Sequence, residues 1–507
     1  MKKFSSIFTA VCVSISAVLA VYMFWQRLAH LMTAFPYDHF SVYIRAYLNG
    51  AHLTDSLSYD ELYSLATAWP SLKLSYIWHE ILLKDVNLPL YNLMLYGWNH
   101  IFPTEPFYLR LFNTLPSLAA VPTAYFFAPA AWPKLKRFML TALTAGSFIL
   151  VTFGFNIRAY SFAVWAGMVF TLLALRMIDL FAHQKNPSAK YWSTFFIIGL
   201  FGSYLHYFCA GLFFITALVV FLYACYYKTG RATAFWGTAA VFAAWFPWVI
   251  NTYLLMSAPS GSWWYAVPVM RSTWDILQFI FGSPSMVGYG LIFLIVSAVS
   301  LVHTQKKRLL LNASIVLPVA QIVLLVAVVA VVSLKYNLWI DRYFVALMPA
   351  ILVLTGSCLY HLYERHRLLI VLLPIILLVW INLYWNMYAL LRAEYTGLKD
   401  AFSFISQNWP NQPVYVDTAK TGYPEKALQV MLHYYAPNPQ INLIALSKEN
   451  APQAAQTPKP PVLMPLCTQY HLMQFSFDYN LEEDREPYLF GSDVCVFTAH
   501  PVPEARP

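Results

Sequence analysis

Long apolar runs separated by short polar connections make up most of the chain. The first run covers residues 7–25, and the others lie near residues 107–131, 137–155, 161–182, 191–208, 210–227, 233–254, 287–304, 309–333, 343–361 and 368–391. A helix needs about 20 apolar residues to cross the hydrocarbon core of a bilayer. The pattern therefore predicts an α-helical polytopic membrane protein with about eleven transmembrane helices.

The first run predicts an uncleaved signal anchor over residues 1–25, because Lys2 and Lys3 precede it and it is long enough to span. Residues 26–106 then form a long polar loop, and residues 107–392 form the multi-span membrane domain. The loop contains amphipathic stretches at 72–83 and 88–101. These predict helices along the outer membrane interface, with aromatic side chains at the level of the headgroups: Trp78, Tyr91, Tyr96 and Trp98.

The charges of the connecting loops predict the orientation. If the N-terminus is cytoplasmic, every short inside loop carries at least two basic residues: Lys134, Lys136 and Arg137; Lys185 and Lys190; Lys228 and Arg231; Lys306, Lys307 and Arg308; Arg365 and Arg367. The short outside connections hold little beyond Arg158, Lys335 and Arg342. This agrees with the positive-inside rule at each step and places residues 393–507 outside.

The C-terminal region is polar and rich in proline, and it predicts a small extracytoplasmic α/β domain over residues 393–507. Its pattern predicts a helix at 401–409, a strand at 413–416, a second helix at 426–435 and a flexible linker at 451–461. Cys467 and Cys495 lie in this region. They could form a disulfide in an oxidising compartment, and the sequence leaves this open.

Composition agrees with the membrane class. The chain is 59% hydrophobic and 11% charged, whereas soluble domains carry about 25% charged residues. The formal net charge of +9 resides mostly in short loops, where it sets topology, so a nucleic-acid partner is excluded. The chain has no C-x-x-C pair, which disfavours a thiol-based zinc or redox site.

Two adjacent carboxylates, Asp60 and Glu61, stand in the first outer loop at the start of a helical pattern. Acids at such a position also commonly cap a helix N-terminus. The two roles are compatible, because a capped carboxylate is held rigidly and stays ionised. Such a group can act as a general base on an acceptor hydroxyl.

Cationic side chains recur at the outer ends of the predicted spans. Arg158 could clamp a phosphate or extend to the headgroups. His206 lies in an apolar run, where a histidine is either a functional group or a helix-packing hydrogen-bond partner. Arg342 could bind phosphate or pair with Asp341 next to it.

A long outer loop at residues 256–285 holds Trp263, Trp264, Tyr265 and Arg271. The three aromatic residues could form a surface on which a sugar ring stacks, or an interfacial belt. The first-loop acids, the cations and this loop all fall on the outer membrane face. A cleft with acids beside cations suits a substrate whose leaving group is a lipid phosphate.

The chain resembles the GT-C superfamily of polyprenol-phosphate-dependent glycosyltransferases, particularly protein O-mannosyltransferases and lipid A aminoarabinose transferases. The resemblance covers residues 58–350 and rests on short motifs in the family's order: Asp60-Glu61 with Tyr63, Asn87-Leu88-Pro89-Leu90-Tyr91 leading to Trp98, Arg110, Arg158-Ala159-Tyr160, His206-Tyr207, and Arg342-Tyr343 with Pro349. Relatives often have His-Pro-Pro-Leu or Lys-Pro-Pro-Leu where this chain has Asn87-Leu88-Pro89-Leu90.

The resemblance implies transfer of one sugar from a lipid-linked donor, with inversion at the anomeric carbon. It implies the following roles: Asp60 as the base, Glu61 as a supporting acid or metal ligand, Arg158 and Arg342 as contacts of the donor phosphate, and Lys84 and His206 as further phosphate candidates. It leaves the need for a divalent cation open.

The sequence therefore predicts a glycosyltransferase of the bacterial inner membrane that uses a polyprenyl-phosphate sugar and a cell-envelope acceptor, which is a glycan, a lipid or a protein. The absence of a Gly-rich phosphate loop and of a D-x-D motif agrees with a lipid-linked donor. Two alternatives remain at this stage. One is a polymerase or ligase that uses polyprenyl diphosphate-linked oligosaccharides, and the other is a transporter or flippase.

Overall fold

The computed structural model describes residues 2–33, 59–257, 269–281, 312–335, 338–410, 412–417, 442–447, 451–456, 459–464, 479, 481–483, 487–490 and 494–501. The chain divides into two compact units. The first unit comprises Met1–Leu28, Leu74–Met94 and Leu111–Trp385. The second unit comprises Ala29–Lys73, Leu95–Arg110 and Asn386–Pro507.

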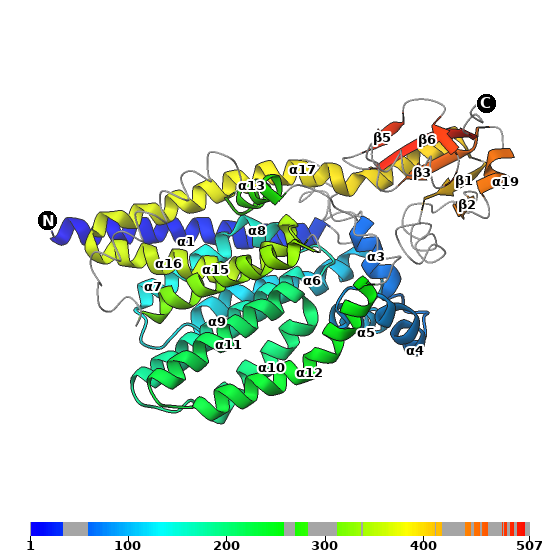
Figure 1. Cartoon of the computed structure of the whole chain (residues 1–507). Coiled ribbons are helices and arrows are strands. Elements are labelled where there is room, and N and C mark those ends of the chain that lie inside the picture. Colours follow the sequence, from blue (N-terminus) through cyan, green and yellow to red (C-terminus); the bar gives the residue numbers. More distant parts are fainter. Residues whose placement is uncertain are drawn as a thin grey trace. The chain divides into compact units, whose positions relative to one another are not determined.

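The first unit is a bundle of helices (Figure 1). The helices that contribute to it are α1 (Lys2–Thr33), α6 (Pro106–Phe126), α7 (Lys134–Gly146), α8 (Phe148–Thr152), α9 (Tyr160–Ala182), α10 (Ala189–Leu205), α11 (Tyr207–Tyr226), α12 (Arg231–Ser257), α13 (Val269–Phe281), α15 (Ala313–Ser333), η4 (Asp341–Leu347), α16 (Met348–Arg365), η5 (Arg367–Val371) and the first part of α17 (Leu372–Asn408). Helices α9, α10 and α11 pack against one another, and α12 packs on α10 and α11.

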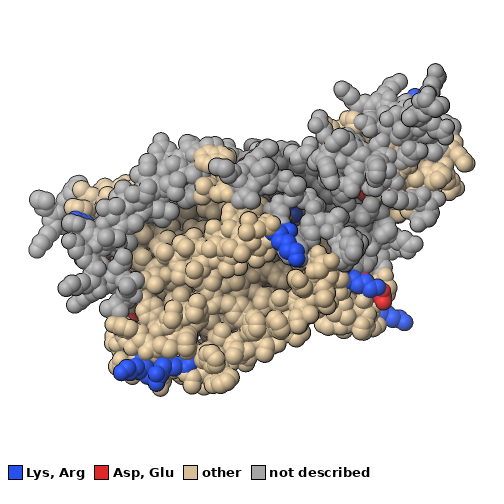
Figure 2. All heavy atoms as spheres, viewed as in Figure 1, with Lys and Arg blue, Asp and Glu red and all other residues tan. Residues whose placement is uncertain are grey.

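Seven helices of the described chain are long and apolar enough to cross a membrane. They cover Ser5–Ala29, Tyr160–Ala182, Tyr207–Tyr226, Arg231–Ser257, Ala313–Ser333, Arg342–Arg365 and Arg367–Trp385. Of the other predicted runs, three coincide with α6, with α7 and α8, and with α10, and the run at 287–304 lies outside the described residues. Figure 2 shows a broad face on which the described side chains are almost all uncharged. The chain is thus a multi-pass membrane protein.

The run at 137–155 is interrupted, where a single span is predicted. Helix α7 ends at Gly146, Ser147 has an extended backbone, and α8 begins at Phe148. The Ser147 hydroxyl accepts a hydrogen bond from the backbone N–H of Leu150, so it caps α8. A capping serine inside an apolar run therefore ends one helix and starts the next.

A polar network crosses the interior of the bundle. Gln321 of α15 donates from Nε2 to Thr171 Oγ1 of α9 at 2.9 Å and to Thr216 Oγ1 of α11 at 2.7 Å. All three side chains are fully buried. Side-chain hydrogen bonds between membrane helices typically contribute about 0.6 kcal/mol each, so this network fixes the register of the three helices.

The first outer loop is helical where the structure describes it. Its elements are α3 (Tyr59–Thr67), α4 (Leu74–Tyr76), the π-helical η1 (Ile77–Ile81), η2 (Leu82–Lys84) and α5 (Pro89–Ile101). The predicted helix at 72–83 is thus three short pieces, and the one at 88–101 is confirmed as α5. Trp78 is 38% exposed, as an interfacial residue would be, but Tyr91 is only 4% exposed. The prediction that Tyr91 lies among headgroups is wrong, because its ring is packed inside the protein.

The C-terminal part of the second unit contains a six-stranded sheet in the order β2-β1-β3-β6-β4, with β5 also paired to β6. The strands are β1 (Pro413–Val416), β2 (Asn442–Ala445), β3 (Pro461–Met464), β4 (Leu481–Glu483), β5 (Tyr488–Phe490) and β6 (Val494–Pro501). Strand β1 is parallel to β2 and β3, with Tyr415 opposite Ile444 and Val462. Strand β6 is antiparallel to β3, β4 and β5.

The four predictions for this region have different outcomes. The strand at 413–416 is confirmed, and the helix at 401–409 is the last part of α17. The helix at 426–435 lies outside the described residues. The flexible linker at 451–461 is wrong: Ala451–Gln456 forms α19, and Ala451 and Ala454 are buried with Tyr415, Val462 and Phe497. The small alanine side chains let this segment pack closely, and the composition of the segment does not reveal this packing.

A glycine on α10 provides a test of the bundle. A Cβ at Gly199 would lie 2.0 Å from Cε2 of Phe213, whose ring is held between Phe170 and Phe195 at centroid distances of 5.6 and 5.2 Å. We expect Gly199→Val to lower the free energy of unfolding by about 1–3 kcal/mol through overpacking. The control is Gly97→Val on α5, where nothing lies within 4 Å of an added Cβ. Thermal unfolding in one detergent measures both; equal melting temperatures would contradict this packing.

Candidate functional site

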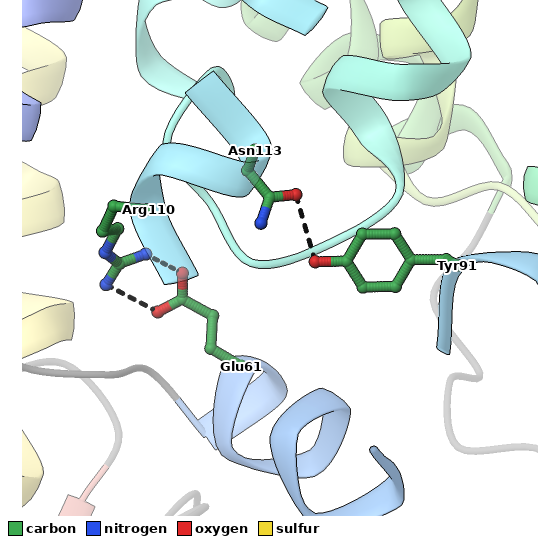
Figure 3. Close-up of polar contacts among 4 residues, drawn as sticks. All are labelled: Glu61, Tyr91, Arg110 and Asn113. Carbon is green, nitrogen blue, oxygen red and sulfur yellow. Dashed lines mark hydrogen bonds and ion pairs between the residues drawn. The ribbon is translucent and has the colours of Figure 1, made fainter. Parts of the chain in front are cut away.

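The acidic pair stands in the first turn of α3, in the second unit. The side chain of Asp60 lies outside what the structure describes, but Glu61 is described and is 0% exposed. Both Glu61 oxygens bind Arg110 of α6, which is also fully buried: Nη1 contacts Oε1, and Nη2 donates to Oε2 at 3.1 Å (Figure 3). A bidentate pair of this kind has the strongest geometry that a carboxylate and a guanidinium can adopt.

The pair constrains what Glu61 can do. Arg110 contacts both Glu61 oxygens, so Glu61 is poorly placed to bind a metal ion or another hydrogen-bond donor. Among the described residues, no group of three or more His, Cys, Asp or Glu side chains could hold a metal ion. The bidentate contact therefore ties the first turn of α3 to α6.

Helix α5 fixes the two segments that carry the pair. Within the second unit, Asn99 donates from Nδ2 to the carbonyl of Ala68 at 3.0 Å, just after α3 ends. Trp98 donates from Nε1 to the carbonyl of Tyr108 at 3.0 Å, in the first turn of α6. Because α5 binds both backbones, the distance between Glu61 and Arg110 does not rely on the ion pair alone.

A second buried polar contact lies one turn further along α6, in the first unit. Tyr91 donates from its hydroxyl to Asn113 Oδ1 at 3.0 Å (Figure 3). Asn113 is fully buried, and the ring of Tyr91 contacts Phe112 and Phe162 at centroid distances of 6.0 and 6.2 Å. This explains why Tyr91 packs inside the protein: its hydroxyl has a partner there.

The first unit brings several of the predicted cationic residues together. His206 lies between α10 and α11, outside both helices, and its ring contacts Tyr343 at 5.3 Å and Tyr160 at 5.8 Å between centroids. Burial, with a smaller effect of the Arg158 charge, lowers the pKa of His206 to about 4. Its Nδ1 accepts a hydrogen bond from the Phe208 N–H at 3.3 Å, as a neutral ring would. Arg342, which precedes Tyr343, is half-buried, as is Arg158.

Lys84 has a different environment. Its Nζ lies 2.5 Å from Glu80 Oε2, one helical turn earlier, and both side chains are exposed. The hydrogen bond from Lys84, followed by its charge, lowers the pKa of Glu80. Lys84 thus pairs with a carboxylate of its own segment.

A turn at residues 83–87 is a feature that the predicted site residues do not include. Asp85 is only 7% exposed, and its Oδ1 accepts hydrogen bonds from the N–H and the Nδ2 of Asn87, both at 3.0 Å. Tyr207 donates to the carbonyl of Val86 at 2.9 Å, and Asn251 donates to the carbonyl of Leu83 at 3.1 Å. The turn is therefore tied to the start of α11 and the end of α12.

Sequence signals for these missed residues exist. Asp85-Val86-Asn87 before Pro89 is a typical Asx turn, because the Asp side chain bonds the backbone two residues on. Arg110 is an ionisable residue at the start of an apolar run, and such residues are functional candidates by default. Arg110 belongs to the motifs of the resemblance, but the sequence gives it no role, because its partner 49 residues away cannot be read from spacing.

Other predicted residues fall outside the described part of the structure. Trp263, Trp264 and Tyr265 are among them, as are the side chains of Arg271 and Asp341. Cys467 and the side chain of Cys495, which could form a disulfide, also lie outside the described residues. These assignments stay predictions.

The buried pair gives a direct test. Arg110→Met and Glu61→Gln each leave one buried group without its partner, and we expect each to lower the free energy of unfolding by about 3–5 kcal/mol. The double variant should lose less than the sum of the two, because it removes both ionic groups. Thermal unfolding of the purified protein measures all three.

The exposed Lys84–Glu80 pair supplies the matched control for this experiment. Lys84→Met removes a cation from a pair of the same chemistry at the surface, where solvent screens the interaction. It should leave the melting temperature unchanged. If Arg110→Met were equally silent, Glu61 and Arg110 would not form a buried pair.

No family model matches the chain, and no curated protein sequence matches it. The fold does match solved structures. The apo structure of ArnT from Cupriavidus metallidurans aligns with a TM-score of 0.50 at 12% identity, over 93% of this chain and 100% of that chain. ArnT from the same organism bound to undecaprenyl phosphate aligns with a TM-score of 0.49 at 11% identity, over 92% and 99%.

An archaeal oligosaccharyltransferase, AglB from Archaeoglobus fulgidus in complex with an inhibitory peptide and a dolichol-phosphate, aligns with a TM-score of 0.39 at 12% identity, over 91% of this chain and 69% of that chain. The chain therefore shares the fold of the apo ArnT structure, and this is the level at which the resemblance indicated by its sequence motifs is supported.

Proposed function

We propose that the chain is a glycosyltransferase that moves one sugar from a polyprenyl-phosphate donor, of the undecaprenyl class, to a cell-envelope glycan, lipid or protein at the outer face of the bacterial inner membrane. The observation that carries the proposal is the buried Glu61–Arg110 pair directly beside Asp60, in a chain with a GT-C fold. A structural protein has no need for a desolvated ion pair at the start of an outer-loop helix.

Asp60 acts as the general base in this proposal. The acceptor hydroxyl oxygen attacks the anomeric carbon, and its proton passes to the Asp60 carboxylate. The bond between the anomeric carbon and the phosphate oxygen breaks, so polyprenyl phosphate leaves with the bonding electron pair. A direct displacement of this kind inverts the anomeric configuration. Glu61 positions the first turn of α3 through Arg110, and the pair holds the neighbouring base in place.

In this proposal Arg158, His206 and Arg342 bind the phosphate of the donor. The leaving phosphate gains negative charge as the glycosidic bond breaks, and guanidinium groups stabilise that charge with paired N–H donors. His206 is neutral, and its Nδ1 accepts a hydrogen bond from the N–H of Phe208. Its Nε2–H can therefore donate a hydrogen bond to the phosphate. Lys84 is a weaker member of the set, since Glu80 balances its charge.

The membrane arrangement belongs to the same proposal. About eleven spans with a cytoplasmic N-terminus would leave residues 26–106 and the α/β domain at 393–507 outside. Trp263, Trp264 and Tyr265 would stack on a sugar ring near the outer face. Support comes from the loop charges, which agree with this orientation at each connection.

Asp60→Asn tests the base. We expect it to slow sugar transfer by about 10²- to 10⁴-fold, because an amide cannot accept the hydroxyl proton. The measurement uses membranes containing the protein, radiolabelled undecaprenyl-phosphate sugars and an envelope extract as the acceptor. Glu105→Gln is the control, because Glu105 is an exposed acid of the same loop. Equal product from Asp60→Asn and wild type would remove Asp60 from the mechanism.

The same assay separates the alternatives. Transfer of an oligosaccharide from a polyprenyl diphosphate donor, without transfer from the monophosphate, would indicate a polymerase or ligase. Movement of the labelled lipid across the bilayer with no transfer to any acceptor would indicate a transporter or flippase.

An alkaline phosphatase fused after residue 450 tests the orientation. The enzyme folds with its disulfides only outside the cytoplasm, so we expect high phosphatase activity. A fusion after residue 186, in the predicted inside loop that carries Lys185, is the matched control and should be inactive. High activity at 186 and none at 450 would reverse the orientation and place the proposed site on the wrong side.

A further inference from the structure

Arg27 of α1 is a buried guanidinium that the proposed chemistry does not use. It is 2% exposed, lies near the end of the first span and belongs to the first unit. Its Nη1 donates to the carbonyl of Ala145 at 2.6 Å, and its Nη2 donates to the carbonyl of Thr144 at 2.9 Å. Both carbonyls belong to the last turn of α7. The guanidinium therefore binds the negative end of the α7 dipole and satisfies carbonyls that the helix end leaves open.

The same guanidinium reaches a second element. Arg27 Nε donates to Ser117 Oγ of α6 at 3.1 Å, and Ser117 Oγ donates to the carbonyl of Leu150 in α8 at 3.1 Å. Arg27 thus holds both sides of the break at Ser147: the end of α7 directly, and α8 through Ser117.

The segment after α8, residues 153–159, begins in contact with Ser117. A Cβ at Gly154 would lie 2.5 Å from Ser117 Oγ and 2.6 Å from the carbonyl of Leu150, so the backbone there is in direct contact with Ser117. Residues 153–159 follow without a helix, Phe155 and Ile157 are buried, and this segment carries Arg158. The backbone that presents Arg158 therefore starts from a point set by Arg27 and Ser117.

We propose that Arg27 is a positioning residue for Arg158: through Ser117 and the end of α7 it fixes the segment 153–159 that presents the Arg158 guanidinium to a phosphate group. This inference rests on the proposed role of Arg158 at the donor phosphate. A displacement of about 1 Å in a positioning element can cost up to about 10²-fold in function, which makes the effect measurable.

A matched control exists in the same unit. Arg176 of α9 also donates to main-chain carbonyls just after a helix, to Phe126 from Nη2 and to Ala128 from Nε at 3.0 Å. It makes the same kind of contact at the end of α6, and within the described part of the chain it makes no hydrogen bond to residues 144–159. Loss of Arg176 should lower stability as loss of Arg27 does, without moving the Arg158 segment.

The first experiment measures the dissociation constant of undecaprenyl phosphate for the purified full-length protein in lipid nanodiscs. We expect Arg27→Met and Arg158→Ala each to weaken binding by about tenfold, and Arg27→Lys to weaken it less. Arg176→Met should stay within about twofold of wild type. In the Arg158→Ala background, Arg27→Met should cost no more than about a further twofold, because the two residues act as one unit.

The outcomes separate the two proposals. Suppose that Arg158→Ala weakens binding tenfold. The positioning role alone is then overturned if Arg27→Met binds as Arg176→Met does, or if Arg27→Met adds its full effect in the double variant. Unchanged binding in Arg158→Ala overturns the phosphate role of Arg158 in the proposed function, and the inference falls with it.

Hydrogen exchange of the backbone amides of residues 153–159 provides a readout that does not involve lipid. Ser117→Ala removes one hydroxyl and keeps the helix, so it should fold even if Arg27→Met does not. We expect faster exchange in Arg27→Met and Ser117→Ala and wild-type exchange in Arg176→Met. Exchange rates equal to wild type in Ser117→Ala would show that the segment does not depend on this contact and would refute the proposal.

Discussion

Two charges sealed from water, on Glu61 and Arg110, form the interaction on which the outer-loop end of the candidate site depends. Removing a carboxylate and a guanidinium from water costs several kcal/mol each, and only a well-aligned pair repays it. The bidentate contact meets that requirement, and α5 secures both flanking backbones through Asn99 and Trp98. These contacts also hold the backbone at Asp60, which is the base in the proposed mechanism.

In the first unit, buried polar side chains are likewise satisfied inside the protein, but by neutral partners. Gln321 binds two threonine hydroxyls, and Arg27 binds the carbonyls of a helix end. In an apolar environment no water satisfies such groups, so each must find a partner inside the protein. The consequence is that polar side chains fix helix ends and helix registers. The non-helical segment that carries Arg158 follows helices fixed in this way.

Much of the fold was predictable because its signals are local. Apolar runs predicted the positions of the described spans, and the strand predicted at 413–416 is β1. The failures have physical causes. The run at 137–155 contains Ser147, whose side chain ends one helix and caps the next. The segment at 451–461 has linker-like composition, but its alanines pack against Tyr415 and Phe497.

By itself, the sequence determined the membrane class, the helix positions and the expected sidedness, because hydropathy and loop charge add up residue by residue. It also singled out the acidic pair, Arg158, His206 and Arg342 by type and position. Only the tertiary structure decided the partners: Glu61 with Arg110 across 49 residues, Arg27 with α7 across 117 and 118, and Lys84 with nearby Glu80. Partner choice depends on which groups lose water together, and that is set by how distant segments pack.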